Sequence, residues 1–382
     1  MSKSRKYSIA VVTNVIPQYR EDMYRRLISY YGDKLHIYCQ DSIPGMNLNL
    51  VHNQFKDNVS LLKYASLKRE KLSWQCLPLW MLYKNYDIIY FYGNPRVLSN
   101  VIWATILKLL GKKVVIWGQY HTAGANKHME DLRLLWWSLF DYVFLYTESE
   151  ANQYKIKFPG VKLASGMNNG LNQYEIEQAI GNYSPEKLSQ WKIDNGVDDR
   201  SIILSCARLE PKNNFGLFLN CLDKLVNEHP DILWCVIGKG EEELKLKQKA
   251  TDLKLDKHIR WLGAIYEQDK LAPWFLSSKL LVHPGSIGLS LLHAMGYGLP
   301  VLTHNNLDMQ MPEIAALKDQ VNGLLYVDGD QDSLVDKVNS VISGKVDVER
   351  ISKNAKLTAS REYNTEVMSN KLITMNEAIQ EY

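Results

Sequence analysis

Short apolar runs alternate with longer amphipathic segments along most of this 382-residue chain. Each run has the length of a buried strand, and each amphipathic segment has the spacing of a surface helix. Strands that alternate with helices indicate parallel pairs, because a parallel pair needs a crossover connection. The sequence therefore predicts α/β domains on mostly parallel sheets. The expected strands lie at 7–13, 35–39, 87–92, 113–117, 142–146 and 161–164, and again at 202–206, 232–237, 258–263, 279–283, 300–303 and 322–325.

The alternation stops near residue 172 and starts again near residue 200. The polar stretch 173–199 between the two halves predicts a linker with one short helix that begins at Pro185. Two domains also suit the length, since single cores rarely grow beyond about 250–300 residues. We expect two Rossmann-like domains, over 1–172 and 200–365.

Composition excludes several classes of protein. Five cysteines without C-x-x-C spacing predict neither a disulfide framework nor a zinc site, and they fit a reducing cytoplasm. No apolar run reaches the roughly 18 residues of a membrane-spanning helix. The basic start leads into a strand instead of the apolar core of a signal peptide. We expect a cytoplasmic protein.

The net charge of +3 hides an asymmetry between the halves. Residues 1–165 hold 22 Lys and Arg against 12 Asp and Glu, and six of the ten tryptophans. A basic, aromatic-rich domain indicates an anionic partner, such as a membrane surface, a lipid-linked pyrophosphate or nucleic acid. We expect peripheral contact with the inner face of the cytoplasmic membrane, and no nucleic acid, because no recognised nucleic-acid module accompanies the charge. A mixed surface without a special partner is the alternative.

Ligands of open parallel sheets bind at the carboxyl ends of the strands, so polar residues there are candidate site residues. Arg208 and Lys212 follow the strand at 202–206, and together they can hold a diphosphate and stabilise it as a leaving group. Taken singly, each reads as a solvated surface charge. The candidates in the first half are Asn14, Tyr19, Arg20, Asn94, Arg96, Gln119 and His121.

The stretch 283–301 reads as a strand end, a tight Gly/Ser turn, a helix and another strand. Gly285 and Gly288 let the backbone approach a ligand, and the helix that begins near Leu289 directs N–H groups into the turn. This pattern suits a phosphate or a polyol. An ordinary strand–turn–helix element is the alternative, and Gly238-x-Gly240 is equally open to both interpretations.

Several motifs follow one another in the second half. They are ARLxxK at 207–212, VIGKGEEEL at 236–244, IRWLGAI at 259–265, HPGSIGLSLLHAMGYGLPVLT at 283–303, PEI at 312–314 and NGLLY at 322–326. In this order they make the second half similar to the donor domain of glycosyltransferase family 4, a retaining group with the GT-B fold. The first half resembles that family more loosely, through NxIPxYR at 14–20 and Trp117-Gly118. The resemblance implies two Rossmann-like domains that face each other across a cleft, with a last helix at about 366–382 packing back on the first.

The resemblance also implies roles for single residues. Arg208 and Lys212 would hold the diphosphate of a UDP- or GDP-sugar, and His121 would contact the reacting sugar. The other implied donor-binding residues are Gly263, Ser286, Ile287, Gly288, Leu289, His293 and Glu313, and the acceptor side would include Asn14, Tyr19 and Arg20.

One departure concerns the donor sugar. The family pattern has two glutamates where this chain has Gly285 and His293. A histidine can still hydrogen-bond ribose hydroxyls, whereas a glycine offers no carboxylate. This form resembles a divergent subgroup of bacterial surface-polysaccharide transferases.

We expect a retaining hexosyltransferase without cofactor or metal that acts on a glycan or polyprenyl-linked saccharide in surface polysaccharide, lipopolysaccharide or capsule biosynthesis. Asp328-x-Asp330 imitates a metal-binding motif but lies in a polar loop before a helix. Two alternatives remain open. One is a degenerate GT-B protein that only binds a sugar nucleotide or acts as a scaffold, and the other is a nucleotide-sugar epimerase or hydrolase.

Overall fold

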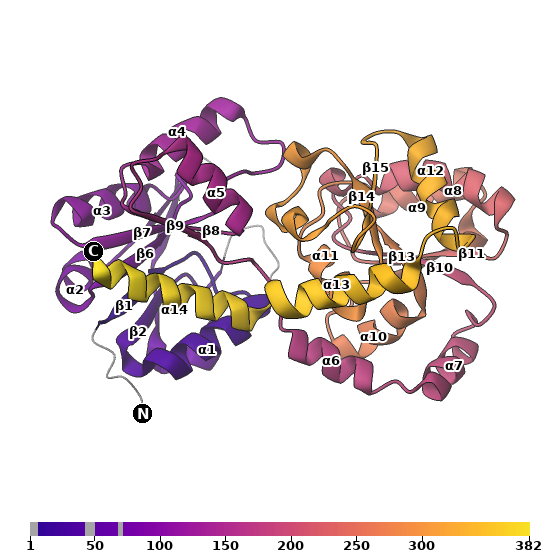
Figure 1. Ribbon diagram of the computed structural model, residues 1–382, viewed down its shortest axis with the longest axis horizontal. Helices are drawn as coiled ribbons and strands as arrows, with labels where there is room; N and C mark the ends of the chain where they lie inside the picture. The colour runs from indigo at the N-terminus through magenta and orange to yellow at the C-terminus, as the bar shows by residue number, and fades with distance from the viewer. Residues whose placement is uncertain (1–6, 43–49, 68–71) are drawn as a thin grey trace. The chain divides into compact units, whose positions relative to one another are not determined.

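The computed structural model describes residues 7–42, 50–67 and 72–382 (Figure 1). The chain divides into two compact units. Unit 1 comprises residues 1–169 and 365–382, and unit 2 comprises residues 170–364. Both units are α/β domains, which confirms the predicted fold class.

Unit 1 is built on a seven-stranded parallel sheet with the order β3-β2-β1-β6-β7-β8-β9. Its central strands are apolar along their whole length, as strands covered on both faces must be. A short antiparallel hairpin, β4-β5, was not predicted. The strands are β1 (Ile9–Val12), β2 (Leu35–Cys39), β3 (Val59–Leu61), β4 (Tyr64–Leu67), β5 (Leu72–Gln75), β6 (Ile88–Tyr92), β7 (Lys113–Gly118), β8 (Tyr142–Leu145) and β9 (Leu163–Gly166).

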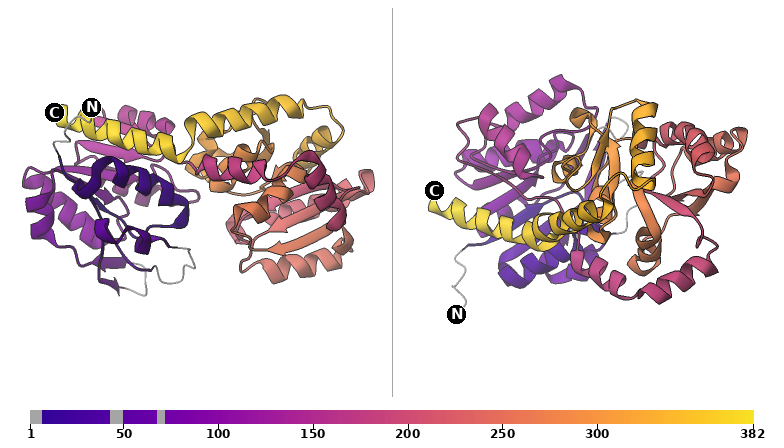
Figure 2. Two further views of the ribbon diagram at one scale, coloured as in Figure 1. Left: turned by 90° about the horizontal axis from the view of Figure 1, so that it is seen from below. Right: turned by 45° about the vertical axis from the view of Figure 1, so that its right-hand side comes forward.

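Helices cover both faces of this sheet because the crossovers run in opposite directions from β1. Right-handed connections through β6, β7, β8 and β9 place α3, α4 and α5 on one face, together with α2. The opposite face carries α1 and the C-terminal helix α14, which lies along unit 1 in the views of Figure 2. The helices are α1 (Glu21–Tyr31), α2 (Leu79–Asn85), α3 (Leu98–Leu109), α4 (Lys127–Trp137), α5 (Glu148–Lys157) and α14 (Thr365–Glu381).

Unit 2 contains a six-stranded parallel sheet with the order β12-β11-β10-β13-β14-β15. Helices α8, α9 and α12 pack on one face, and α10 and α11 pack on the other. The strands are β10 (Ser201–Cys206), β11 (Ile232–Ile237), β12 (Ile259–Gly263), β13 (Ser278–Val282), β14 (Val301–His304) and β15 (Leu324–Tyr326). The helices are α8 (Phe215–Glu228), α9 (Glu243–Asp252), α10 (Gln268–Ser277), α11 (Leu289–Tyr297), α12 (Gln331–Ile342) and α13 (Val348–Glu362).

The strand order of unit 2 reverses between β10 and β13. The chain proceeds from β10 outward to β12 and then returns to β13 on the other side of β10. Connections leave such a pair of strands in opposite directions, and ligands bind in the crevice that opens there. The loop after β10 and the loop after β13 therefore form the candidate site of this unit.

The expected linker over 173–199 is wrong, apart from the helix that begins at Pro185. The segment forms α6 (Gln173–Gly181) and α7 (Pro185–Asp194), and both belong to unit 2. Ile176 and Ala179 of α6 are buried in the same core as α10 and α11. Their spacing gives this otherwise polar segment a short apolar stripe, which is enough to seat a helix on the domain.

Candidate functional site

The packing around Gly285 explains why this chain lacks the first glutamate of the family pattern. A side chain at this position would collide with the backbone carbonyl of Lys212 and with the backbone of Asn213. The Ser286 N–H donates to that Lys212 carbonyl at 3.0 Å. The loops after β10 and β13 therefore touch backbone to backbone, and only a glycine fits between them.

Asn213 joins the same two loops through its side chain. Its amide nitrogen donates to the Arg208 carbonyl at 2.6 Å, and its amide oxygen lies 3.2 Å from Nε2 of His283. Burial lowers the pKa of His283 to about 3, so this histidine is neutral at physiological pH and its Nε2–H can donate to Asn213. These contacts fix the position of the loop that carries Arg208 and Lys212 relative to the end of β13.

Arg208 and Lys212 meet at one carboxylate, that of Glu210. Arg208 Nη1 lies 2.7 Å from Glu210 Oε1, and Lys212 Nζ lies 3.2 Å from Glu210 Oε2. Both cationic side chains are more than half exposed. Exposed ion pairs add little stability, so the two cations can turn to an incoming anion at small cost. Glu210 was not singled out from the sequence, although it lies between the two predicted residues.

Two backbone groups of the glycine turn are occupied within the protein. The Ser286 N–H is bound to Lys212, and the Ile287 N–H donates to Gln310 Oε1 at 2.8 Å. Gln310 is buried and donates in turn to Thr303 Oγ1 and to the His304 carbonyl. These two N–H groups therefore hold the turn in place.

The first turn of α11 offers the backbone donors instead. Gly288 is the N-cap residue, and no side chain of the described residues caps this end of the helix. Gly288 and Leu289 therefore begin a helix whose positive end opens at the switch point. Glu313 is buried beside this turn, since its Oε2 lies 3.8 Å from the position that a Cβ at residue 288 would take. It brings a carboxylate to the region from which both family glutamates are missing.

His293 packs against α10, within α11. Its Nε2 lies 2.9 Å from Gln268 Oε1, which also accepts a hydrogen bond from the Tyr297 hydroxyl at 2.9 Å. Its ring lies against Phe275, with the centroids 4.8 Å apart. Burial lowers the pKa of His293 to about 4. The neutral ring donates through Nε2, which makes Nδ1 a hydrogen-bond acceptor, as a carboxylate would be.

Three further glycines of unit 2 support these loops. A Cβ at Gly238 or Gly240 would collide with the carbonyl of Ala207 or Leu209, so both glycines let the loop after β11 pack on the loop after β10. Gly263 has a φ of +69° at the end of β12, and its carbonyl accepts from the Gly238 N–H at 2.8 Å. The packing interpretation of Gly238-x-Gly240 is therefore favoured.

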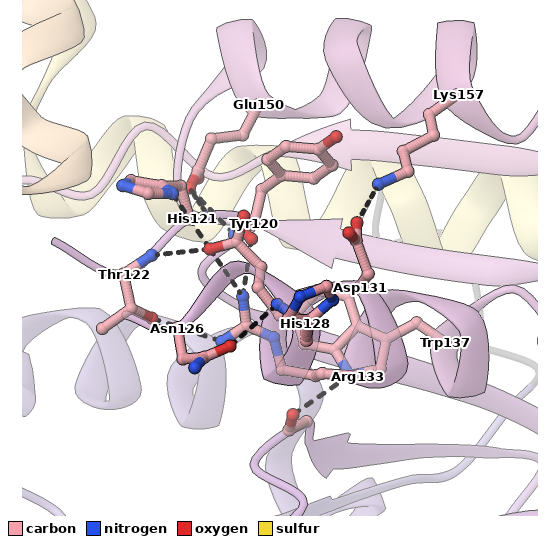
Figure 3. Close-up of polar contacts among 12 residues, drawn as sticks. Tyr120, His121, Thr122, Asn126, His128, Asp131, Arg133, Trp137, Glu150 and Lys157 are labelled. Atoms are coloured by element: carbon pink, nitrogen blue, oxygen red, sulfur yellow. Dashed lines mark hydrogen bonds and ion pairs between the residues drawn. The ribbon is translucent and has the colours of Figure 1, made fainter. Parts of the chain in front are cut away.

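The candidate site of unit 1 lies in the loop after β7. His121 Nδ1 lies 2.9 Å from Oε2 of Glu130, in the first turn of α4. Glu150 on α5 accepts through Oε1 from the backbone N–H groups of Tyr120 and His121, at 2.9 and 3.4 Å. Arg133 of α4 donates to the Tyr120 carbonyl at 2.6 Å (Figure 3). Two helices thus clamp the loop and orient His121.

The predicted acceptor-side residues differ in exposure. Tyr19 is exposed, whereas the Arg20 side chain is only 3% exposed. The Arg20 guanidinium donates to Met167 Sδ at 3.3 Å and lies over the rings of Trp117 and Tyr146. Arg20 therefore holds together the strand ends of unit 1 by cation–π contact. The side-chain oxygen of Asn14 is buried and accepts no hydrogen bond from the described residues.

The aspartates at 328 and 330 have local structural roles. Asp330 caps α12 by accepting from the N–H groups of Asp332 and Ser333, and Asp328 accepts from the Asn306 amide at 2.8 Å. In the described ranges, no group of three His, Cys, Asp or Glu side chains is arranged to hold a metal ion.

The family model for glycosyl transferases group 1 matches residues 189–358. The similarity to this family therefore covers that part of the chain, which is less than half of its length. The match confirms the resemblance predicted from the motifs, and it contains the switch point between β10 and β13. The region is called the group 1 domain below.

Curated relatives match the chain over part of its length. The amylovoran biosynthesis glycosyltransferase AmsK of Erwinia amylovora is 26% identical over 204 residues, which are 51% of this chain and 49% of AmsK. A phosphatidyl-myo-inositol mannosyltransferase of Mycobacterium leprae is 28% identical over 174 residues, 44% of each chain. The chain thus spans about half the length of the curated relatives it matches.

Solved structures resemble the whole chain. HepE of Anabaena in complex with UDP has a TM-score of 0.74 at 16% identity, and the likeness covers 98% of this chain and 100% of that one. The lipopolysaccharide outer core galactosyltransferase WaaB has a TM-score of 0.65 at 16% identity, with 97% and 99% covered. At these identities the likeness shows the fold alone. It is the GT-B fold, with two Rossmann-like domains.

Proposed function

We propose that the protein transfers a hexose-type sugar from a UDP- or GDP-sugar to a glycan or lipid-linked acceptor in the synthesis of a surface polysaccharide. One observation carries the proposal: the loop with Arg208 and Lys212 packs, at the Lys212 carbonyl, against the glycine turn that leads into α11. The relatives support it, because AmsK is named for amylovoran biosynthesis and HepE has been solved with UDP and with UDP-glucose.

The proposed chemistry follows from charge. When the bond between C1 of the sugar and the diphosphate oxygen breaks, the leaving group gains negative charge. Arg208 and Lys212 would take it up by charge-assisted hydrogen bonds, and the positive end of α11 would add to them. The acceptor oxygen bonds to C1, and its proton passes to the departing phosphate, with retention at C1. These groups can stabilise the diphosphate without a metal ion.

Donor recognition would fall to the residues around the glycine turn. The Nδ1 acceptor of His293 suits a ribose hydroxyl, and the Glu313 carboxylate beside Gly288 suits hydroxyls of the sugar. Gly263 would lie near the base. In unit 1, His121, Asn14 and Tyr19 would serve the acceptor side, with Arg20 as their buried support.

A binding protein without turnover is the second candidate. The packing of Gly285 on Lys212 favours it, because no carboxylate can occupy the position of the first family glutamate. The retained pair of cations on Glu210 argues for a catalyst. A protein that only binds would show UDP or GDP binding without transfer from any donor in a panel of acceptors.

The test combines binding and transfer. A thermal-shift screen of UDP- and GDP-sugars identifies the donor, since a ligand of the native state raises the unfolding temperature. Transfer from that donor is then compared between wild type, Arg208→Ala and Arg350→Ala. Arg350 is a matched control, because it is also exposed and paired with a nearby carboxylate, that of Asp347. Full transfer by Arg208→Ala would overturn the proposal.

We also propose a cytoplasmic location with peripheral contact to an anionic membrane. Among the described residues, no helix is both long and apolar enough to span a bilayer. The positive charge of residues 1–165 is the support for membrane contact.

A further inference from the structure

Three helices of unit 1 expose an unusual number of large apolar side chains. All three are seated on the same face of the sheet, where Leu82 of α2, Leu107 of α3 and Trp137 of α4 are buried in one core. Their outer sides carry what we term the apolar face. It consists of Trp80 and Met81 from α2, Ile102, Leu109 and Leu110 from α3 and its end, and Met129, Leu132, Leu135 and Leu139 from α4 and the turn after it.

The members of this face lie on neighbouring elements. The Trp136 indole N–H of α4 donates to Thr105 Oγ1 of α3 at 3.4 Å, so these helices are in contact. On α4, Met129, Leu132 and Leu135 follow one another at three-residue spacing and form one stripe. Single exposed apolar residues are ordinary, but a contiguous patch marks an interaction site.

The charges around the apolar face are mostly positive. Asp141, which follows the last leucine of the face, is paired with Lys108 and Lys162. Residues 88–129, which include α3 and the start of α4, contain no Asp or Glu. The two acidic residues that follow, Glu130 and Asp131, are paired with His121 and Lys157. The same stretch holds Arg96, Lys108, Lys112, Lys113 and Lys127.

Lysines also border the aromatic rings of α2. Lys84 Nζ lies 4.3 Å from the ring centroid of Trp80, and Lys112 Nζ lies 5.0 Å from that of Tyr83. Tryptophan and lysine side by side suit the boundary of a bilayer, where the ring enters the headgroup layer and the ammonium meets lipid phosphates. A water-soluble protein partner would not require this excess of positive charge.

We infer that the apolar face docks on an anionic lipid bilayer. The leucines and Trp80 enter the headgroup boundary, and Lys84 and Lys112 neutralise lipid phosphates. This inference rests on the proposed function, because it gives the proposed membrane contact a defined surface. It would bring unit 1 to the membrane that carries a lipid-linked acceptor.

The experiment measures flotation of the full chain with vesicles. Vesicles of phosphatidylcholine mixed with phosphatidylglycerol are compared with vesicles of phosphatidylcholine alone. We expect wild type to float with the anionic vesicles only, and the double variant Leu109→Gln/Leu135→Gln to bind them at least about tenfold more weakly. The control is Leu244→Gln/Ile193→Gln in unit 2, whose side chains are 82% and 55% exposed against 81% and 60% for the test pair.

Each other outcome would overturn the inference. These are no flotation of wild type with anionic vesicles, equal flotation of the test pair and wild type, or a dimer in sedimentation that only the test pair dissociates. The last result would assign the apolar face to a second copy of the chain. Transfer to a soluble acceptor should be unchanged in the test pair, so loss of all transfer in wild type would contradict the proposed function and not the docking face.

Discussion

Glu130 and His121 form the closest carboxylate–imidazole pair of the candidate site in unit 1, with Oε2 and Nδ1 2.9 Å apart. Such a bond fixes the ring and places a proton on Nδ1. Glu130 also accepts from the Thr122 N–H at 3.3 Å, so the same carboxylate holds the loop that carries the histidine. We propose Glu130 as a positioning residue for His121.

Replacing Glu130 tests this role. Glu130→Gln should lower kcat about tenfold with little change in the KM for the donor, since a weakened hydrogen bond misplaces His121 without removing it. The ¹⁵N resonances of the His121 ring, assigned through His121→Gln, should report a smaller fraction of Nδ1–H. Asp131→Asn is the control, because the adjacent Asp131 pairs with Lys157. An unchanged tautomer in Glu130→Gln would refute the positioning role.

Lys212 and Arg208 should stabilise the same negative charge, which develops on the leaving diphosphate. Each single change to alanine should lower kcat/KM by about 10²–10³, as for the loss of one preorganised donor. The double variant should lose less than the product of the two, because both side chains stabilise the same leaving group. Steady-state kinetics of wild type, both singles and the double gives the coupling. Fully multiplicative losses would show that the two cations act at separate places.

Restoring the first family glutamate should damage the fold. Gly285→Glu forces a side chain into the backbone of Lys212 and Asn213, which should lower the free energy of unfolding by about 2 kcal/mol or more. Urea unfolding measures the loss. Gly181→Glu makes the same chemical change where no atom lies within 4 Å and should cost little. Equal stability of the two variants would mean that the loops do not touch.

The free energy of unfolding should fall as the pH is lowered from about 6.5 towards 4, because of His293. His293 has a folded pKa of about 4, below the usual value of about 6.5, so the unfolded chain binds its proton first. Its contribution is complete above about pH 6.5 and is lost towards pH 4, with a slope of up to about 1.4 kcal/mol per pH unit. Urea unfolding of His293→Gln should show a flatter pH dependence than wild type. The same change at exposed His128 should leave the slope as it was.

Much of the fold could be predicted from the alternation of apolar runs and amphipathic segments. The strands β1, β2 and β6 to β15 lie at or within two residues of the expected ranges. The pattern is local, because a strand covered on both faces must be apolar throughout and its crossover helix must carry an apolar stripe. The polar helix α6, the edge strand β3 and the hairpin β4-β5 were missed, since their apolar signals are short.

The sequence also determined which loops to examine, because Arg208, Lys212 and the glycine turn all follow strands. Only the tertiary structure decided their partners. The contact of Lys212 with Gly285 depends on how loops from different strands meet. The contacts of Glu210 with the two cations and of Glu130 with His121 depend on how a single connection folds back on itself. The strand order places β13 beside β10 although β11 and β12 intervene in the chain. No local pattern records that neighbourhood, because it arises from the direction in which each crossover returns to the sheet.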